Sequence, residues 1–230
     1  MIQQRRPKIR RLLRRLASDT SGLALLEFAF SLPILLALSL SGAELTNFVI
    51  TRMRVSQLAL HIADNAARIG SGTQLEAKKI TEADINDLLI GAGLQANDLK
   101  LFDNGRVIIS SIEPDPAHEG KSMIRWQRCK GAKTAWTSSI GAARTDNKTG
   151  FGPAGRQVSA PEDVVVIFVD VRYQYTPLIE TSISPATEIH ETASMMVRDR
   201  RDTGGDEDKG SAATHPYGIY KVDGVVASTC

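Results

Sequence analysis

The most regular hydrophobic pattern in the chain is a long apolar run near its start. Residues 23–43 contain one charged side chain, Glu27, and their length matches the roughly 20 residues that a helix needs to cross a bilayer. Beyond this run, apolar residues recur with the i, i+3, i+4, i+7 spacing of a helix buried on one side, at Val55, Leu58, Ala59, Ile62, Ala66 and Ile69. We therefore predict one helix over 23–70, transmembrane at about 23–43, with a kink at Pro33.

A second, shorter helix is predicted at 82–90. Thr81 and Asp84 have the spacing of a capping box, in which a side chain and a backbone amide at a helix start bond to each other reciprocally. Gly91 and Gly93 then predict the end of this helix, because glycine is common just beyond a helix C-terminus.

After the second helix the hydrophobic period changes to two, which is typical of half-buried strands. The clearest alternation lies at 164–175, where Asp170 and Arg172 fall on the polar side and are interpreted as a solvated pair. A second alternation predicts that Ile124 and Trp126 share one face. The predicted strands are 107–112, 122–128, 164–175 and 188–198.

These elements predict an α+β fold in which a long N-terminal helix packs on a small antiparallel sheet of about four strands. The extracytoplasmic domain is expected to cover 71–198, with a loop at 141–160 that is rich in glycine, serine and charge. Residues 199–230 are expected to form a flexible tail, because their first half is polar and charged.

The distribution of charge along the chain predicts the orientation of the helix across the membrane. The 230-residue chain has a net charge of +2, but residues 1–22 alone hold seven basic residues and one acid. The remainder holds 21 basic and 25 acidic residues, a net charge of −4. Basic residues that precede an apolar span favour a cytoplasmic N-terminus, so the leader 1–22 is predicted in the cytoplasm and the domain in the periplasm. Basic residues are not clustered within the domain, so nucleic-acid binding is not expected.

Three interpretations of the apolar run remain open. It could be a secretory signal cut near Ala43, a plain uncleaved anchor, or a segment cut after Gly22. A carboxylate within lipid costs roughly 2.5–3.5 kcal/mol, so the presence of Glu27 in the apolar run requires an explanation. If a peptidase cut after Gly22, the new amine of Leu23 would lie one helical turn from Glu27, and the pairing would offset much of that cost.

The layout of a basic leader, Gly22, four apolar residues, Glu27, Phe28 and an apolar helix resembles type IV prepilins. The stretch from Gly22 to Leu38, with Pro33 inside it, is more narrowly similar to the TadE/TadG-like pseudopilins of the tight-adherence (Flp pilus) system. Shorter blocks at 126–128, 171–178 and 192–198 resemble that family in the same order, and together the blocks cover part of the chain.

The resemblance implies processing by a prepilin peptidase between Gly22 and Leu23, with Glu27, Phe28 and Pro33 serving assembly. It implies a minor subunit in the bacterial inner membrane or associated with the pilus. The implied partners are other pilins or pseudopilins and the inner-membrane assembly platform, and the implied role is adherence and biofilm formation. The alternative from the residues themselves is an uncleaved single-pass protein with an extracytoplasmic binding or sensing domain.

The cysteines, histidines and short motifs of the chain give few further indications of function. Cys129 and Cys230 both follow the apolar run, so an exported domain could join them in a disulfide, or they could be two unrelated thiols. The four histidines are scattered, and no phosphate-binding loop or nucleophile motif occurs. We therefore expect no enzymatic activity, no cofactor or metal, and no small-molecule substrate.

Overall fold

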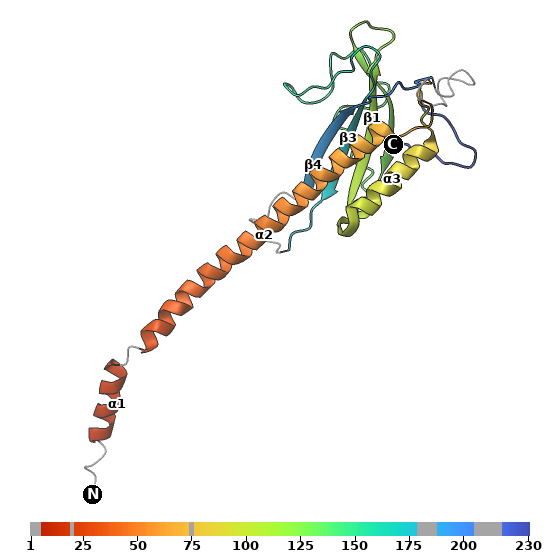
Figure 1. Cartoon of the computed structure of the whole chain (residues 1–230). Coiled ribbons are helices and arrows are strands. Elements are labelled where there is room, and N and C mark those ends of the chain that lie inside the picture. Colours follow the sequence, from red (N-terminus) through yellow and green to blue (C-terminus); the bar gives the residue numbers. More distant parts are fainter. Residues whose placement is uncertain (1–5, 19–20, 74–75, 179–187, 205–217) are drawn as a thin grey trace. The chain divides into compact units, whose positions relative to one another are not determined.

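The structure, a computed structural model, describes residues 6–18, 21–73, 76–178, 188–204 and 218–230 (Figure 1). The chain divides into two compact units. One comprises Met1–Asn47 with Leu178–Ser184, and the other comprises Phe48–Pro177 with Pro185–Cys230. The long helix belongs to both units, and the sheet belongs entirely to the second.

The long N-terminal helix is confirmed. Helix α2 spans Ser21–Arg68 and continues through Pro33. It ends at Arg68, close to the predicted end at residue 70. Gly70 has a φ of +112°, and a Cβ there would lie 2.8 Å from the carbonyl oxygen of Lys79, so this position favours glycine. The leader contains a helix that was not predicted from the sequence, α1 over Arg6–Ser18.

Helix α3, Glu82–Ala96, starts as predicted and ends later. The hydroxyl of Thr81 accepts a hydrogen bond from the amide of Asp84 at 3.2 Å, and the Asp84 carboxylate accepts the Thr81 amide at 2.9 Å. The predicted end at Gly91 and Gly93 is wrong, because α3 runs through both glycines. Close packing explains one of them, since a Cβ on Gly93 would lie 2.6 Å from the ring of Phe102.

The two glycines of α3 give a matched pair of substitutions. Gly91→Ala should raise the free energy of unfolding by about 0.5–1 kcal/mol, since alanine is the better helix former and no atom lies within 4 Å of the added methyl group. Gly93→Ala gains the same propensity but must displace the ring of Phe102, so we expect it to be less stable than Gly91→Ala. Urea unfolding of both variants measures the difference, and equal stability would contradict the packing explanation.

The four strands form one antiparallel sheet with the order β2-β1-β3-β4. A 3-10 turn, η1 over Asn97–Leu99, and a short helix, α4 over Leu101–Asn104, connect α3 to the first strand. The strands are β1 Gly105–Pro114, β2 Ser122–Lys130, β3 Val166–Gln174 and β4 Glu188–Met196. The predicted α+β class and antiparallel sheet are therefore confirmed.

The main core lies between one face of the sheet and the helices α2 and α3 (Figure 1). The predicted stripe on α2 is confirmed, since five of its six residues are buried there and Ile69 packs against them. The alternation on β3 is also confirmed. The odd-numbered residues of the predicted strand 164–175 enter the core, namely Val165, Ile167, Val169, Val171, Tyr173 and Tyr175.

The prediction that Ile124 and Trp126 share a face is wrong. Trp126 belongs to the helix-covered core, whereas Ile124 belongs to a second cluster on the opposite face. The pairing of β1 with β2 explains this, because Ser111 pairs with Trp126 and the next residue, Ile112, pairs with Ile124. Arg125 is therefore an extra residue in β2, and such a bulge reverses the faces on one side of it.

The second face of the sheet is covered by the long connection between β2 and β3. Ile140 and Phe151 of this connection are buried against Ile124, Val166 and Phe168 of the strands. The predicted loop at 141–160 lies within it and contains only isolated bridges, such as that between Phe151 and Val158. The connection and the strands thus share a second, smaller hydrophobic cluster on this face.

The prediction of a flexible tail at 199–230 requires correction where that region is described. Arg201 caps α2, donating to the carbonyl of Ala66 at 3.2 Å and also to that of Ile69. Ile219 is fully buried in the main core, and the backbone of Tyr220 bonds to those of Ile80 and Glu82. These contacts were not predicted because composition reports the polarity of a segment and not its partners.

Candidate processing and assembly segment

The proposed cleavage position lies at the start of α2. Ser21 is the first helical residue, so Gly22 and Leu23 occupy the first turn. The first four amides of a helix have no acceptor within the helix, which makes this turn the easiest part to open. Apart from its two chain neighbours and the backbone of α2, no atom of the described residues lies within 4 Å of the Cβ position of Gly22. Removal of residues 1–22 would therefore shorten the helix by two residues without disturbing a packed contact in the described structure.

Glu27 lies on the same side of α2 as Leu23, because side chains four residues apart are neighbours on a helix. Its side chain is exposed, and within the described part of the chain it has no hydrogen-bond or ion-pair partner. A carboxylate in this position can accept a cation from its own helix end or from a neighbouring subunit. Glu27, the acid selected from the sequence, therefore lies on an exposed surface of α2.

Phe28 and Pro33 also belong to this exposed part of α2. Phe28 is exposed, and its carbonyl accepts a hydrogen bond from the Ser31 hydroxyl at 3.2 Å. Proline has no amide hydrogen, so Pro33 leaves the carbonyl of Ala29 without its usual donor within the helix. Neither residue contacts Glu27 through a hydrogen bond, so the three share a segment and not a compact site.

α2 is the only helix in the described parts of the chain that is long and apolar enough to cross a membrane, judged by length and composition. The most apolar 18-residue window has no buried residue. Its exposed residues are large and aliphatic or aromatic, including Leu25, Phe30, Ile34, Leu35 and Leu38. The chain is therefore compatible with a single-pass membrane protein.

Glu44 follows the predicted span and is not among the functional residues predicted from the sequence. Its side chain is only 6% exposed, and its carboxylate accepts the backbone amide of Leu178 at 2.8 Å. Leu178 follows Pro177, at the end of the segment that leaves β3. The signal available in the sequence was a second acid immediately after the apolar run, with nothing to indicate its partner.

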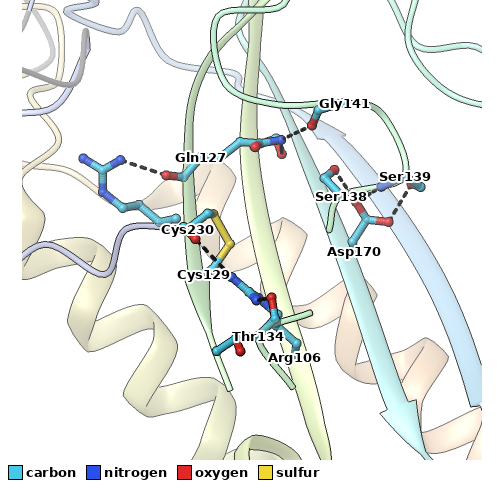
Figure 2. The surroundings of a disulfide bond; sticks show 11 residues. Arg106, Gln127, Cys129, Thr134, Ser138, Ser139, Gly141, Asp170 and Cys230 are labelled. Carbon is cyan, nitrogen blue, oxygen red and sulfur yellow. Dashed lines mark hydrogen bonds between the residues drawn. A yellow bond between two sulfur atoms is a disulfide. The ribbon is translucent and has the colours of Figure 1, made fainter. Parts of the chain in front are cut away.

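The structure joins Cys129 and Cys230 in a disulfide (Figure 2). Cys129 lies near the end of β2, and Cys230 is the last residue of the sequence given. The amide of Cys129 also donates to the carbonyl of Ser228 at 2.8 Å, so residues 228–230 cover part of the outer edge of β2. The bond ties the C-terminal segment, 218–230, to the sheet.

Asp170 is not the solvated residue that was predicted. It is 0% exposed, and its carboxylate accepts hydrogen bonds from the hydroxyls of Ser138 and Ser139 at 2.6 Å each (Figure 2). The carboxylate also lies 2.8 Å from His190 Nε2. Burial raises the pKa of Asp170, but the hydrogen bonds from His190 and the serines outweigh it and hold the pKa below its usual value. Arg172 pairs instead with Glu188 at 3.1 Å. The carboxylate therefore anchors the loop that covers the second face.

The domain also contains a buried ion pair, between Arg128 and Glu82. A hollow of about 550 Å³ lies between β2 and the C-terminal segment, and its wall includes the buried ion pair of Arg128 with Glu82. In the described residues, no three His, Cys, Asp or Glu side chains come together as metal ligands. The pair links α3 to β2, and removing either partner would leave the other charge buried without compensation.

Comparisons of the chain with protein-family models, curated proteins and solved structures give no match.

Proposed function

We propose that the chain is a minor pseudopilin or assembly component of a Flp-type (tight-adherence) pilus. A prepilin peptidase cuts it after Gly22, and the mature subunit serves adherence and biofilm formation. Its partners are other pilins or pseudopilins and the assembly platform of the bacterial inner membrane. In this proposal the protein is a structural subunit and not an enzyme, and it uses no cofactor or small-molecule substrate.

The observation that carries the proposal is the position of Glu27. An exposed carboxylate in an apolar helix is costly in lipid unless a cation accompanies it. Cleavage after Gly22 creates that cation on Leu23, on the same side of the helix. In a filament the amine of a neighbouring subunit could serve equally, and the pairing would then fix the axial register between subunits.

Two further features support export of the domain. The disulfide between Cys129 and Cys230 is of a kind that persists in oxidising compartments such as the periplasm. The seven basic residues precede α2, and this asymmetry favours a cytoplasmic N-terminus. Both features agree with an inner-membrane subunit whose sheet lies outside the cytoplasm.

The test is N-terminal sequencing of the membrane-extracted protein from cells with and without a prepilin peptidase. We expect the mature chain to begin at Leu23 only when the peptidase is present. An intact N-terminus in both strains would favour the uncleaved single-pass protein with a binding or sensing domain. A cut near Ala43 would identify an ordinary secretory signal.

A separate prediction concerns the charge of Glu27. Glu27→Gln should leave cleavage intact but lower incorporation into assembled pili at least about tenfold, which corresponds to 1.4 kcal/mol of lost attraction. Glu27→Asp keeps the charge and should retain more assembly than Glu27→Gln. Quantitative immunoblots of sheared pili and of membranes measure both steps. Equal assembly by the wild type and Glu27→Gln would show that the carboxylate has no such role.

A further inference from the structure

Helix α1 presents two large apolar side chains to solvent. Leu12 is 65% exposed and Leu13 is 61% exposed, and both lie near the middle of a 13-residue helix. A charge-based orientation signal requires basic residues and no particular placement of leucines. The two leucines therefore need a separate explanation.

The leucines and the arginines of α1 lie on opposite sides of the helix. At about 100° per residue, Leu12 and Leu13 share one side, while Arg11, Arg14 and Arg15 share the other. The sequence continues both patterns along the helix. Apolar residues occupy positions 9, 12, 13 and 16, and basic residues occupy positions 8, 10, 11, 14 and 15.

We propose that α1 lies in the plane of the membrane surface and binds anionic phospholipid. Its leucines enter the boundary between headgroups and acyl chains, and its arginines contact lipid phosphates. A basic amphipathic helix has the chemistry for this position, because apolar burial and charge attraction act at the same interface. The proposal rests on the proposed orientation, in which the leader faces the cytoplasm.

The chain itself keeps α1 at the membrane. Only residues 19 and 20 separate the end of α1 from the start of α2, the helix suited to cross the bilayer. The three Cα–Cα steps from Ser18 to Ser21 span at most about 11 Å, so the C-terminal end of α1 lies close to the headgroups. Nucleic acid would match the arginines but would leave Leu12 and Leu13 in water, and for this reason a lipid surface is the better partner.

The arrangement bears on processing. An interfacial α1 would hold Gly22 at the depth of the headgroups, where a membrane peptidase can reach it. Cleavage after Gly22 would then release the whole lipid-binding helix from the mature subunit. The uncleaved chain is thus held at the membrane by two elements and the mature chain by one.

The test uses the full uncleaved chain in nanodiscs, without a peptidase, so its result does not depend on processing. Amide hydrogen exchange over residues 6–18 is compared in phosphatidylcholine discs and in discs with added phosphatidylglycerol. A helix of 13 residues is marginal in water, so protection reports binding to the bilayer. We expect exchange to be at least about tenfold slower in the anionic discs.

Two variants separate an interfacial helix from simple charge attraction. Leu12→Gln with Leu13→Gln keeps every charge and should abolish most of the protection. Arg11→Leu with Leu12→Arg keeps both composition and net charge but places an arginine among the leucines, and it should lose protection as well. Wild-type protection in either variant would overturn the proposal, as would the absence of protection in anionic discs. Stronger protection by added duplex RNA or DNA than by phosphatidylglycerol would assign the helix to nucleic acid instead.

Discussion

Breaking the bond between Cys129 and Cys230 should lower the free energy of unfolding of the domain by about 2–5 kcal/mol. The bond closes a loop across a sequence separation of 101 residues. A cross-link of that span removes much conformational freedom from the unfolded chain. For a domain of this size, that decrease in the free energy of unfolding corresponds to a decrease in Tm of roughly 5–15 °C.

The C-terminal segment should detach first. In Cys230→Ser, residues 228–230 keep the hydrogen bond from Cys129 to Ser228 and that from Ser228 to Asn86 but lose their covalent tie. Hydrogen exchange should therefore rise at the Cys129 amide before the core opens. The double variant Cys129→Ser with Cys230→Ser is the control and should match the single variant. A Tm equal to that of the wild type in oxidising buffer would contradict this account.

The elements predicted best are those whose pattern is repeated many times. The alternation on β3 extends over twelve residues from 164 to 175, and the stripe on α2 covers four turns. Each was assigned to the correct face because many residues follow the same period, and burying all of them on one face stabilises the fold. The capping box of α3 was also predictable, because its two partners, Thr81 and Asp84, are three residues apart.

The errors arose where one residue or one distant partner decides the outcome. Arg125 adds a single residue to β2, and its effect is to reverse the face of Ile124. Gly93 looks like a helix end but lies against Phe102, a contact that no local rule predicts. Periodicity cannot show either feature, since both depend on which strand or ring lies opposite.

The candidate segment on α2 was predictable because its chemistry is local. Gly22, Leu23 and Glu27 lie within two turns of one helix, so their relation follows from helical geometry. The partner of Glu44 is instead Leu178, 134 residues away, and the partners of Asp170 come from a loop and from β4. Such groups look like surface charges in the sequence, because the groups that bury them are contributed by other parts of the chain.

Asp170→Ala should destabilise the domain by about 3–5 kcal/mol, although the residue was first interpreted as solvated. The substitution removes a buried carboxylate and leaves the hydroxyls of Ser138 and Ser139 without their acceptor. Glu188→Gln is the matched control, because its partner Arg172 lies on the same strand as Asp170 and the Glu188 side chain is 43% exposed. It should cost less than about 1 kcal/mol.

The pH dependence gives an independent measurement of the same carboxylate. Because the pKa of Asp170 is lowered in the folded state, its ionised form stabilises the domain above the unfolded pKa of about 3.9. That contribution is lost as the pH falls through the folded pKa. The stability difference between the wild type and Asp170→Asn should therefore be largest near pH 7 and should narrow steadily from pH 5 towards pH 2. A difference that stays constant over this range would mean that the charge of Asp170 does not hold the loop, and that the serines are bound through shape and neutral hydrogen bonds alone.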